Sequence, residues 1–136
     1  MSTNYYIRIK FREKPVHIGK SSEGWTFALH YIPGFCEDLD QWKDYLYDRE
    51  NVIFNQYQQK VELADLMEII TNRGKKNQSL NYIGSSDYMT ETEIQDFEKN
   101  HHAVYDSSIG LFRHKDFDTV SRPPNETYDM IEGDFC

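Results

Sequence analysis

The stretch that decides the fold is Tyr5-Tyr6-Ile7-Arg8-Ile9-Lys10-Phe11-Arg12, near the amino terminus. Apolar or aromatic side chains at every second position alternate with Tyr6 and three basic side chains. A period of two is typical of a strand with one buried face. We therefore predict a half-buried strand over residues 5–12, with Phe11 on its buried face and Arg8 on the opposite one.

Two more extended segments follow this strand. After a polar break at Pro15, the segment Val16–Ser22 is short, and Glu23-Gly24 is expected to turn the chain into a third strand over 25–32. The third strand alternates like the first, with Trp25 on its apolar face. Short connections of this kind join antiparallel neighbours, so the first third is predicted to be an antiparallel meander.

Three helices are predicted from capping residues and apolar spacing. The first, over 38–49, starts at Asp38, with Gln41 placed to reach back to the cap amide. The second, over 62–73, ends at Arg73 and Gly74, as helices commonly do. The third, over 90–100, begins with a Thr90/Glu93 capping box.

Further strands are expected at 110–115 and 128–135, with a polar loop at 116–127 between them. Val52 to Val61 is rich in β-branched and aromatic residues, which favours a strand or bent hairpin, and 80–83 is a candidate short strand. The predicted fold class is α+β: an antiparallel sheet, formed by the N-terminal meander and C-terminal strands, packed with two to three helices. At 136 residues the chain is expected to be a single domain, 1–136.

Charge and hydropathy limit the classes of function. The net charge is −8, which argues against broad nucleic-acid binding because phosphate contacts need positive charge. Residues 1–20 contain five cationic side chains and one acidic one, a net of +4, so the remaining 116 residues carry −12. The apolar runs are far shorter than the roughly 18 to 20 residues needed to span a bilayer, and the amino terminus has no secretory signal, so a cytoplasmic protein is expected.

Catalytic and metal-binding patterns are weak. Cys36 and Cys136 lie far apart, without a CxxC pair or suitably spaced histidines, so we predict neither a disulfide framework nor a zinc site. His30 and Cys36 are close in sequence, but no third group that would orient the histidine is identifiable. We expect no cofactor and no enzymatic activity, and a hydrolase built from scattered histidines and acids is the less favoured alternative.

The segment His17-Ile-Gly-Lys-Ser-Ser-Glu-Gly-Trp25 combines glycines, a lysine and two small hydroxyls. It is not a P-loop, because Lys14 occupies the place of the first glycine and a strand follows instead of a helix. A turn of this composition can still hold a phosphate without hydrolysing it. The alternatives are a polar hairpin turn for the segment, a charged edge strand that prevents aggregation for the basic face, and a place in the core for Trp25; the last two are favoured over a role in binding. The candidate ligand-binding residues are Arg8, His17, Gly19, Lys20, Ser21, Ser22 and Trp25.

The string HIGKSSEGWTF, residues 17–27, resembles a signature in a family of small proteins encoded by tailed bacteriophages. Trp42 within DLDQWKDYL and the carboxyl-terminal EGDF are also similar to that family. The similarity covers about 4–73 and 126–136, whereas 75–105 has the character of an insertion particular to this chain. Some relatives carry a cysteine pair before HIGKSS that suggests a metal knuckle, and this chain has FREKP there instead.

The resemblance implies a phage accessory protein acting in the cytoplasm of an infected bacterium. Such proteins often counter bacterial defence, so one expectation is a protein that sequesters a phosphate-containing nucleotide signal without turnover. The alternative is an acidic inhibitor or nucleic-acid mimic that blocks a host defence protein. No membrane partner is expected, and homo-oligomerisation is left open.

Overall fold

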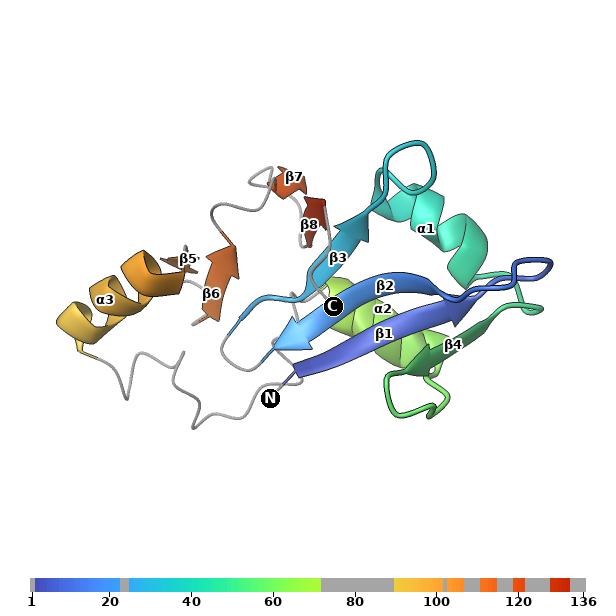
Figure 1. Cartoon of the computed structure of the whole chain (residues 1–136), viewed down its shortest axis with the longest axis horizontal. Helices are drawn as coiled ribbons and strands as arrows, with labels where there is room; N and C mark the ends of the chain where they lie inside the picture. Colours follow the sequence, from blue (N-terminus) through green and yellow to red (C-terminus); the bar gives the residue numbers. More distant parts are fainter. Residues whose placement is uncertain are drawn as a thin grey trace.

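The computed structural model describes residues 2–22, 25–71, 90–101, 103–106, 111–114, 119–121 and 128–132. Within these ranges it contains three helices and eight strands (Figure 1). The helices are α1 (Leu39–Leu46), α2 (Leu63–Thr71) and α3 (Glu91–His101). The strands are β1 (Ser2–Arg8), β2 (Val16–Ser22), β3 (Ala28–Tyr31), β4 (Val52–Asn55), β5 (Ala103–Asp106), β6 (Leu111–His114), β7 (Thr119–Ser121) and β8 (Asp129–Glu132).

The strands form a six-stranded sheet in the order β4-β1-β2-β3-β8-β7 and a separate β5-β6 pair. This confirms the α+β fold class and the antiparallel meander of the first three strands. One pair departs from the prediction, because β8 runs parallel to β3. Parallel neighbours need a long crossover connection, and about a hundred residues separate these two strands in the sequence.

The main core lies between the sheet and helices α1 and α2. Tyr5, Ile7 and Leu29 from the sheet pack with Trp42 of α1 and Leu66 of α2, all buried. Both helices therefore cover the same face of the sheet, and in Figure 1 α2 lies behind β1 and β2. Burying apolar side chains stabilises the fold by about 25 cal/mol per Å² of area removed from water, so this layer supplies much of the driving force.

The first strand is shorter than predicted, and the placement of Phe11 was wrong. Tyr5, Ile7 and Ile9 are buried as expected, but β1 ends at Arg8 and Phe11 is 95% exposed. The chain turns there, with the Arg12 amide bonded to the Ile9 carbonyl oxygen and Phe11 at a φ of 69°. Alternation continues in the sequence beyond the point where the backbone leaves the sheet.

The capping predictions hold with one change of partner. Asp38 accepts a hydrogen bond from the Gln41 amide at 2.7 Å, but the Gln41 side chain reaches the Glu37 amide rather than that of Asp38. Thr90 and Glu93 form the expected reciprocal pair at the start of α3. The proposed end of the second helix at 73–74 lies outside the described residues.

A strand or bent hairpin was expected within 52–61, and the structure has strand β4 followed by a turn that returns the Val61 amide to the Ile53 carbonyl oxygen at 2.9 Å. Both closing strands are confirmed in shortened form as β6 and β8. The loop predicted over 116–127 contains strand β7, which pairs with β8. The candidate strand at 80–83 lies outside the described residues.

Candidate functional site

The face of the sheet opposite α1 and α2 gathers most of the polar and basic side chains of β1, β2 and β3. We call it the open face, because none of the described helices packs on it within the main core. Strand pairing places Tyr6 opposite His17 and Asn4 opposite Lys20, and Phe54 of β4 pairs with Tyr6 on its other side. The residues of the open face used below are Asn4, Tyr6, Arg8, His17, Lys20, His30 and Phe54.

A β-bulge brings His17 and Lys20 to the same face. In a regular strand, residues three apart point to opposite faces. Here the register shifts between Tyr5 and Tyr6, so that Ile18 becomes an extra residue in β2. Ile18 is fully buried on the helix side, while His17 and Lys20 both face their partners on the open face.

A chain of hydrogen bonds crosses the open face from the β4 turn to β3. The Gln56 side-chain oxygen accepts from both the backbone and side-chain nitrogen of Asn4, at 2.9 and 3.0 Å. Asn4 Oδ1 lies 2.9 Å from His17 Nε2, and His17 Nδ1 lies 3.1 Å from His30 Nδ1. His30 Nδ1 is also 3.2 Å from the His17 carbonyl oxygen. Four segments of the chain are thereby tied together.

This geometry assigns the histidine tautomers. Asn4 uses its amide nitrogen as a donor to Gln56, so Oδ1 is its acceptor and His17 carries a proton on Nε2. The Nδ1 atom of a neutral His17 is then an acceptor. His30 therefore carries its proton on Nδ1 and donates it toward His17 Nδ1 and the His17 carbonyl oxygen.

The electrostatics of the face favour a neutral His17. Burial, followed by the nearby His30 and Lys20, lowers the pKa of His17 from 6.5 to about 4, and a hydrogen bond with the Gly19 backbone only partly offsets this. The two flanking cations differ in their surroundings. Lys20 is half-buried opposite Asn4, whereas the exposed Arg8 places its guanidinium over the Phe54 ring, 5.6 Å from the centroid. Positive charge therefore lies on both sides of the histidine pair.

A shallow pocket of about 280 Å³ is lined by Tyr6, Pro15, Phe54, Gln56 and Gln58, and the Arg8 guanidinium lies over the Phe54 ring of this lining. The Tyr6 and Phe54 rings are stacked, with centroids 5.7 Å apart and an interplanar angle of 21°. The two glutamines come from the turn after β4, which Gln58 closes at a φ of 63°. The pocket thus offers flat aromatic surface and side-chain carboxamides.

The predicted site residues do not all meet here. Arg8, His17 and Lys20 lie on the open face, but Ser21 pairs with Thr3 and is buried on the side of the helices. Gly19 sits between Tyr5 and Leu29 in the sheet, where a Cβ atom would lie 2.5 Å from the Phe27 ring. Close packing alone accounts for this glycine. Ser22 ends β2, and Glu23 and Gly24 lie outside the described residues.

Trp25 belongs to a second aromatic cluster, formed with α3 and β6. Its ring centroid is 5.7 Å from that of Phe97 and 6.1 Å from that of Phe112. The Thr26 amide also donates to the Phe112 carbonyl oxygen at 2.8 Å. These contacts favour a packing role for Trp25.

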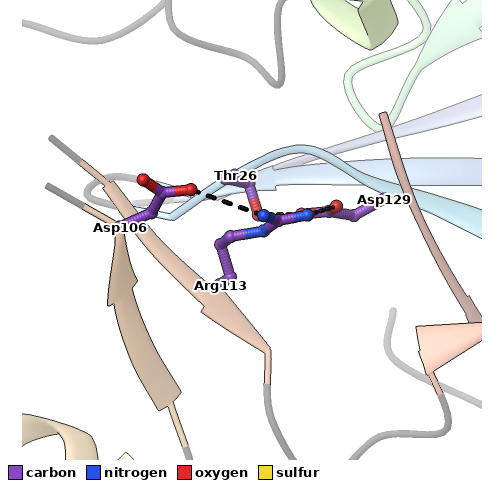
Figure 2. A network of polar contacts seen from close by, with 4 residues as sticks. All are labelled: Thr26, Asp106, Arg113 and Asp129. Carbon is purple, nitrogen blue, oxygen red and sulfur yellow. Dashed lines mark hydrogen bonds and ion pairs between the residues drawn. The ribbon is translucent and has the colours of Figure 1, made fainter. Parts of the chain in front are cut away.

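Next to this cluster, Arg113 joins β6 to the main sheet. Figure 2 shows its guanidinium between Asp106 and Asp129, with the Thr26 hydroxyl bonded to Asp129. Burial alone would lower the pKa of Arg113, but hydrogen bonding to Asp129 and the charges of Asp129 and Asp106 raise it. The network keeps Arg113 charged and is an attachment point for the β5–β6 hairpin.

Cys36 has the properties of a core residue. It is fully buried, and burial raises the pKa of its thiol to about 12. A thiol with so high a pKa is a poor nucleophile at neutral pH. The His30 ring faces His17 on the open face, while Cys36 belongs to the core on the other side.

Sequence reasoning missed Asn4, Tyr6, His30 and Phe54 as members of the site. The alternation of β1 does place Tyr6 beside Arg8, which was a usable signal. The contributions of His30 and Phe54 depend on strand pairing and on the bulge, which no local pattern reveals.

Among the described residues there is no group of three or more His, Cys, Asp or Glu side chains placed to hold a metal ion, and no helix long and apolar enough to cross a membrane. Comparisons of the chain with known protein families, with curated proteins and with solved structures gave no match.

Proposed function

We propose that this chain is a non-enzymatic binding protein that holds a phosphate-containing nucleotide on its open face. In keeping with its resemblance to small tailed-phage proteins, we further propose that it sequesters a nucleotide signal of bacterial defence in the host cytoplasm. The observation that carries the binding proposal is one face that combines a stacked aromatic pair, a pocket and two flanking cations.

The pocket suits a nucleobase. Stacking of a base on an aromatic side chain is worth about 1–3 kcal/mol and tolerates different bases. Tyr6 and Phe54 supply such a surface. The Gln58 carboxamide supplies donors and an acceptor for the edge of a base, and Gln56, whose oxygen accepts from Asn4, supplies donors. Its volume of about 280 Å³ can take a single base rather than an extended strand.

Lys20 and Arg8 suit the phosphate. Charge-assisted hydrogen bonds from ammonium or guanidinium groups to phosphate are roughly twice as strong as neutral ones. Both cations lie on the open face, in a chain whose net charge is −8. Local positive charge on an acidic protein favours a small anion over a long polyanion, which the rest of the surface would repel.

The side chains of the open face are suited to binding a ligand without converting it. The imidazole nitrogens of His17 are engaged by Asn4 and His30, and the Cys36 thiol is buried in the core. Sequestration needs affinity and a rigid site, and the hydrogen-bond chain across the open face supplies rigidity.

The test is thermal unfolding in the presence of a panel of cyclic and linear nucleotides, with inorganic phosphate as a separate arm. A ligand at a hundredfold excess over its Kd stabilises the folded state by about 2.7 kcal/mol. Lys20→Ala should weaken that effect by roughly 1.5–3 kcal/mol, and Tyr6→Leu should weaken it for nucleotides but not for phosphate. Lys99→Ala on α3 is the matched control and should leave binding unchanged.

A second candidate is an acidic inhibitor of a host protein, favoured by α3, which has acidic residues in its first turn and no buried residue. Glu93 caps the helix and Glu98 accepts from the Tyr105 amide, so charge reversals belong at Glu91 and Asp96, which are exposed. If no nucleotide or phosphate raises the melting temperature, or if Lys20→Ala leaves the stabilisation intact, the open face is not the site.

A further inference from the structure

The His17–His30 pair can bind one additional proton but not two. In the neutral pair His30 donates its Nδ1 proton toward His17 Nδ1. An added proton can go to His30 Nε2, which makes His30 cationic and turns the 3.1 Å contact into a charge-assisted hydrogen bond. A further proton would have to go to His17 Nδ1, where two N–H groups would point at each other. The pair therefore titrates as a coupled unit.

The surrounding charges decide when that proton binds. Lys20 on β2 opposes added positive charge, whereas the guanidinium of Arg8 on β1 lies over the Phe54 ring, and the Tyr6 ring meets His17 edge-on without a charge. On the neighbouring β8, the carboxylate of Asp129 is already paired with Arg113. A phosphate beside Lys20 would offset its positive charge and favour the protonated pair.

The partition of the proton between the two rings agrees with this account. Burial is the largest cause that lowers the pKa of His17, and the nearby His30 is the next. His17 is 8% exposed, whereas His30 is only partly buried, so solvation favours placing the charge on His30.

We propose that binding of an anionic ligand on the open face is linked to the uptake of one proton by the His17–His30 pair, with the charge residing on His30. This inference rests on the proposed function, because it concerns the same site. It implies that the protein holds a phosphate-containing ligand more tightly as the pH falls below neutrality.

The probe is 3′,5′-cyclic AMP, whose phosphodiester keeps one negative charge across the range, so that only protons of the protein change. Titration calorimetry between pH 8 and pH 5.5, in two buffers of different ionisation enthalpy, measures both affinity and proton uptake. The wild-type affinity should rise by up to about tenfold per pH unit on acidification, with close to one proton taken up. His30→Gln should lose the pH dependence, whatever affinity it has at pH 8. His101→Gln, a histidine on α3, should keep it.

The outcomes separate this inference from the proposed function. Binding whose affinity does not change with pH would overturn the proton linkage and leave the nucleotide site standing. No binding at any pH would overturn both. In the unliganded protein, ring ¹⁵N shifts should show His17 protonated on Nε2 and still neutral when His30 becomes charged. The opposite order would refute the inference whatever the calorimetry gave.

Discussion

Arg113 Nε donates to Asp129 Oδ2 at 3.1 Å, and this ion pair joins the β5–β6 hairpin to the parallel strand β8 of the main sheet. The Asp129 side chain is almost completely buried, and Arg113 is only 16% exposed. A buried carboxylate is tolerated only when it is paired and hydrogen-bonded. Here Arg113 and the Thr26 hydroxyl provide these contacts (Figure 2).

Replacing Arg113 with Met should therefore lower the free energy of unfolding by about 3–5 kcal/mol, because it removes the cation that neutralises the buried Asp129 carboxylate. Urea denaturation followed by circular dichroism measures the change. The double variant Arg113→Met/Asp129→Leu should recover most of the loss, since an apolar pair needs no counter-charge. A single variant that costs less than about 1 kcal/mol would show that the network is not a structural attachment.

Gly19 should not tolerate a side chain. A Cβ atom there would meet the carbonyl oxygen of Ala28 and the Phe27 ring, both fixed in the sheet and core. Gly19→Ala is expected to destabilise the protein by about 1–3 kcal/mol through overpacking. Gly34→Ala is the comparison, because Gly34 has free space but a φ of 74°, so alanine there costs only the backbone strain of about 1–2 kcal/mol. Gly34→Asn should cost less than Gly34→Ala, because asparagine tolerates a positive φ. At Gly19 no replacement side chain should recover the loss, because the Cβ atom itself has no space.

Phe11 should contribute little to stability although its sequence position predicted burial. It is 95% exposed, and its φ of 69° is unfavourable for a bulky residue. Phe11→Asn is expected to leave the unfolding free energy within about 0.5 kcal/mol or to raise it. Phe27→Ala, at a buried aromatic, should cost about 3–5 kcal/mol in the same urea experiment. Similar losses for the two variants would contradict the observed end of β1.

These cases show which features local sequence patterns predict. Alternation around Tyr5 and Ile7 and the capping pair Thr90/Glu93 depend on residues close in the chain, and both are confirmed. The end of β1 depends on where its partners β2 and β4 stop pairing, so Phe11 was misplaced. The parallel β3–β8 pair joins segments about a hundred residues apart, and no local rule specifies it.

The candidate site was predictable only in part. Arg8, His17 and Lys20 were identified from their residue types, yet the pattern grouped Lys20 with Ser21, which the strand places on the opposite face. One extra residue in β2 changes which side chains share a face. Some bulges can be recognised in a sequence by a glycine that adopts a positive φ, and this bulge has no such glycine. His30 joined the site only through the fold.

His17 should make the stability of the unliganded protein depend on pH. Its pKa falls from 6.5 to about 4 on folding, so the unfolded chain binds the proton more readily than the folded protein. The stabilisation that comes from keeping His17 neutral is thus fully present above about pH 6.5 and is lost as the pH falls toward 4. A shift of this size corresponds to about 3 kcal/mol of unfolding free energy.

Urea midpoints measured from pH 7.5 to pH 4 should fall for the wild type. His17→Gln, which keeps a donor for Asn4 Oδ1, should show a shallower fall by about that amount. Parallel curves for the two proteins would mean that His17 is not held neutral by the fold.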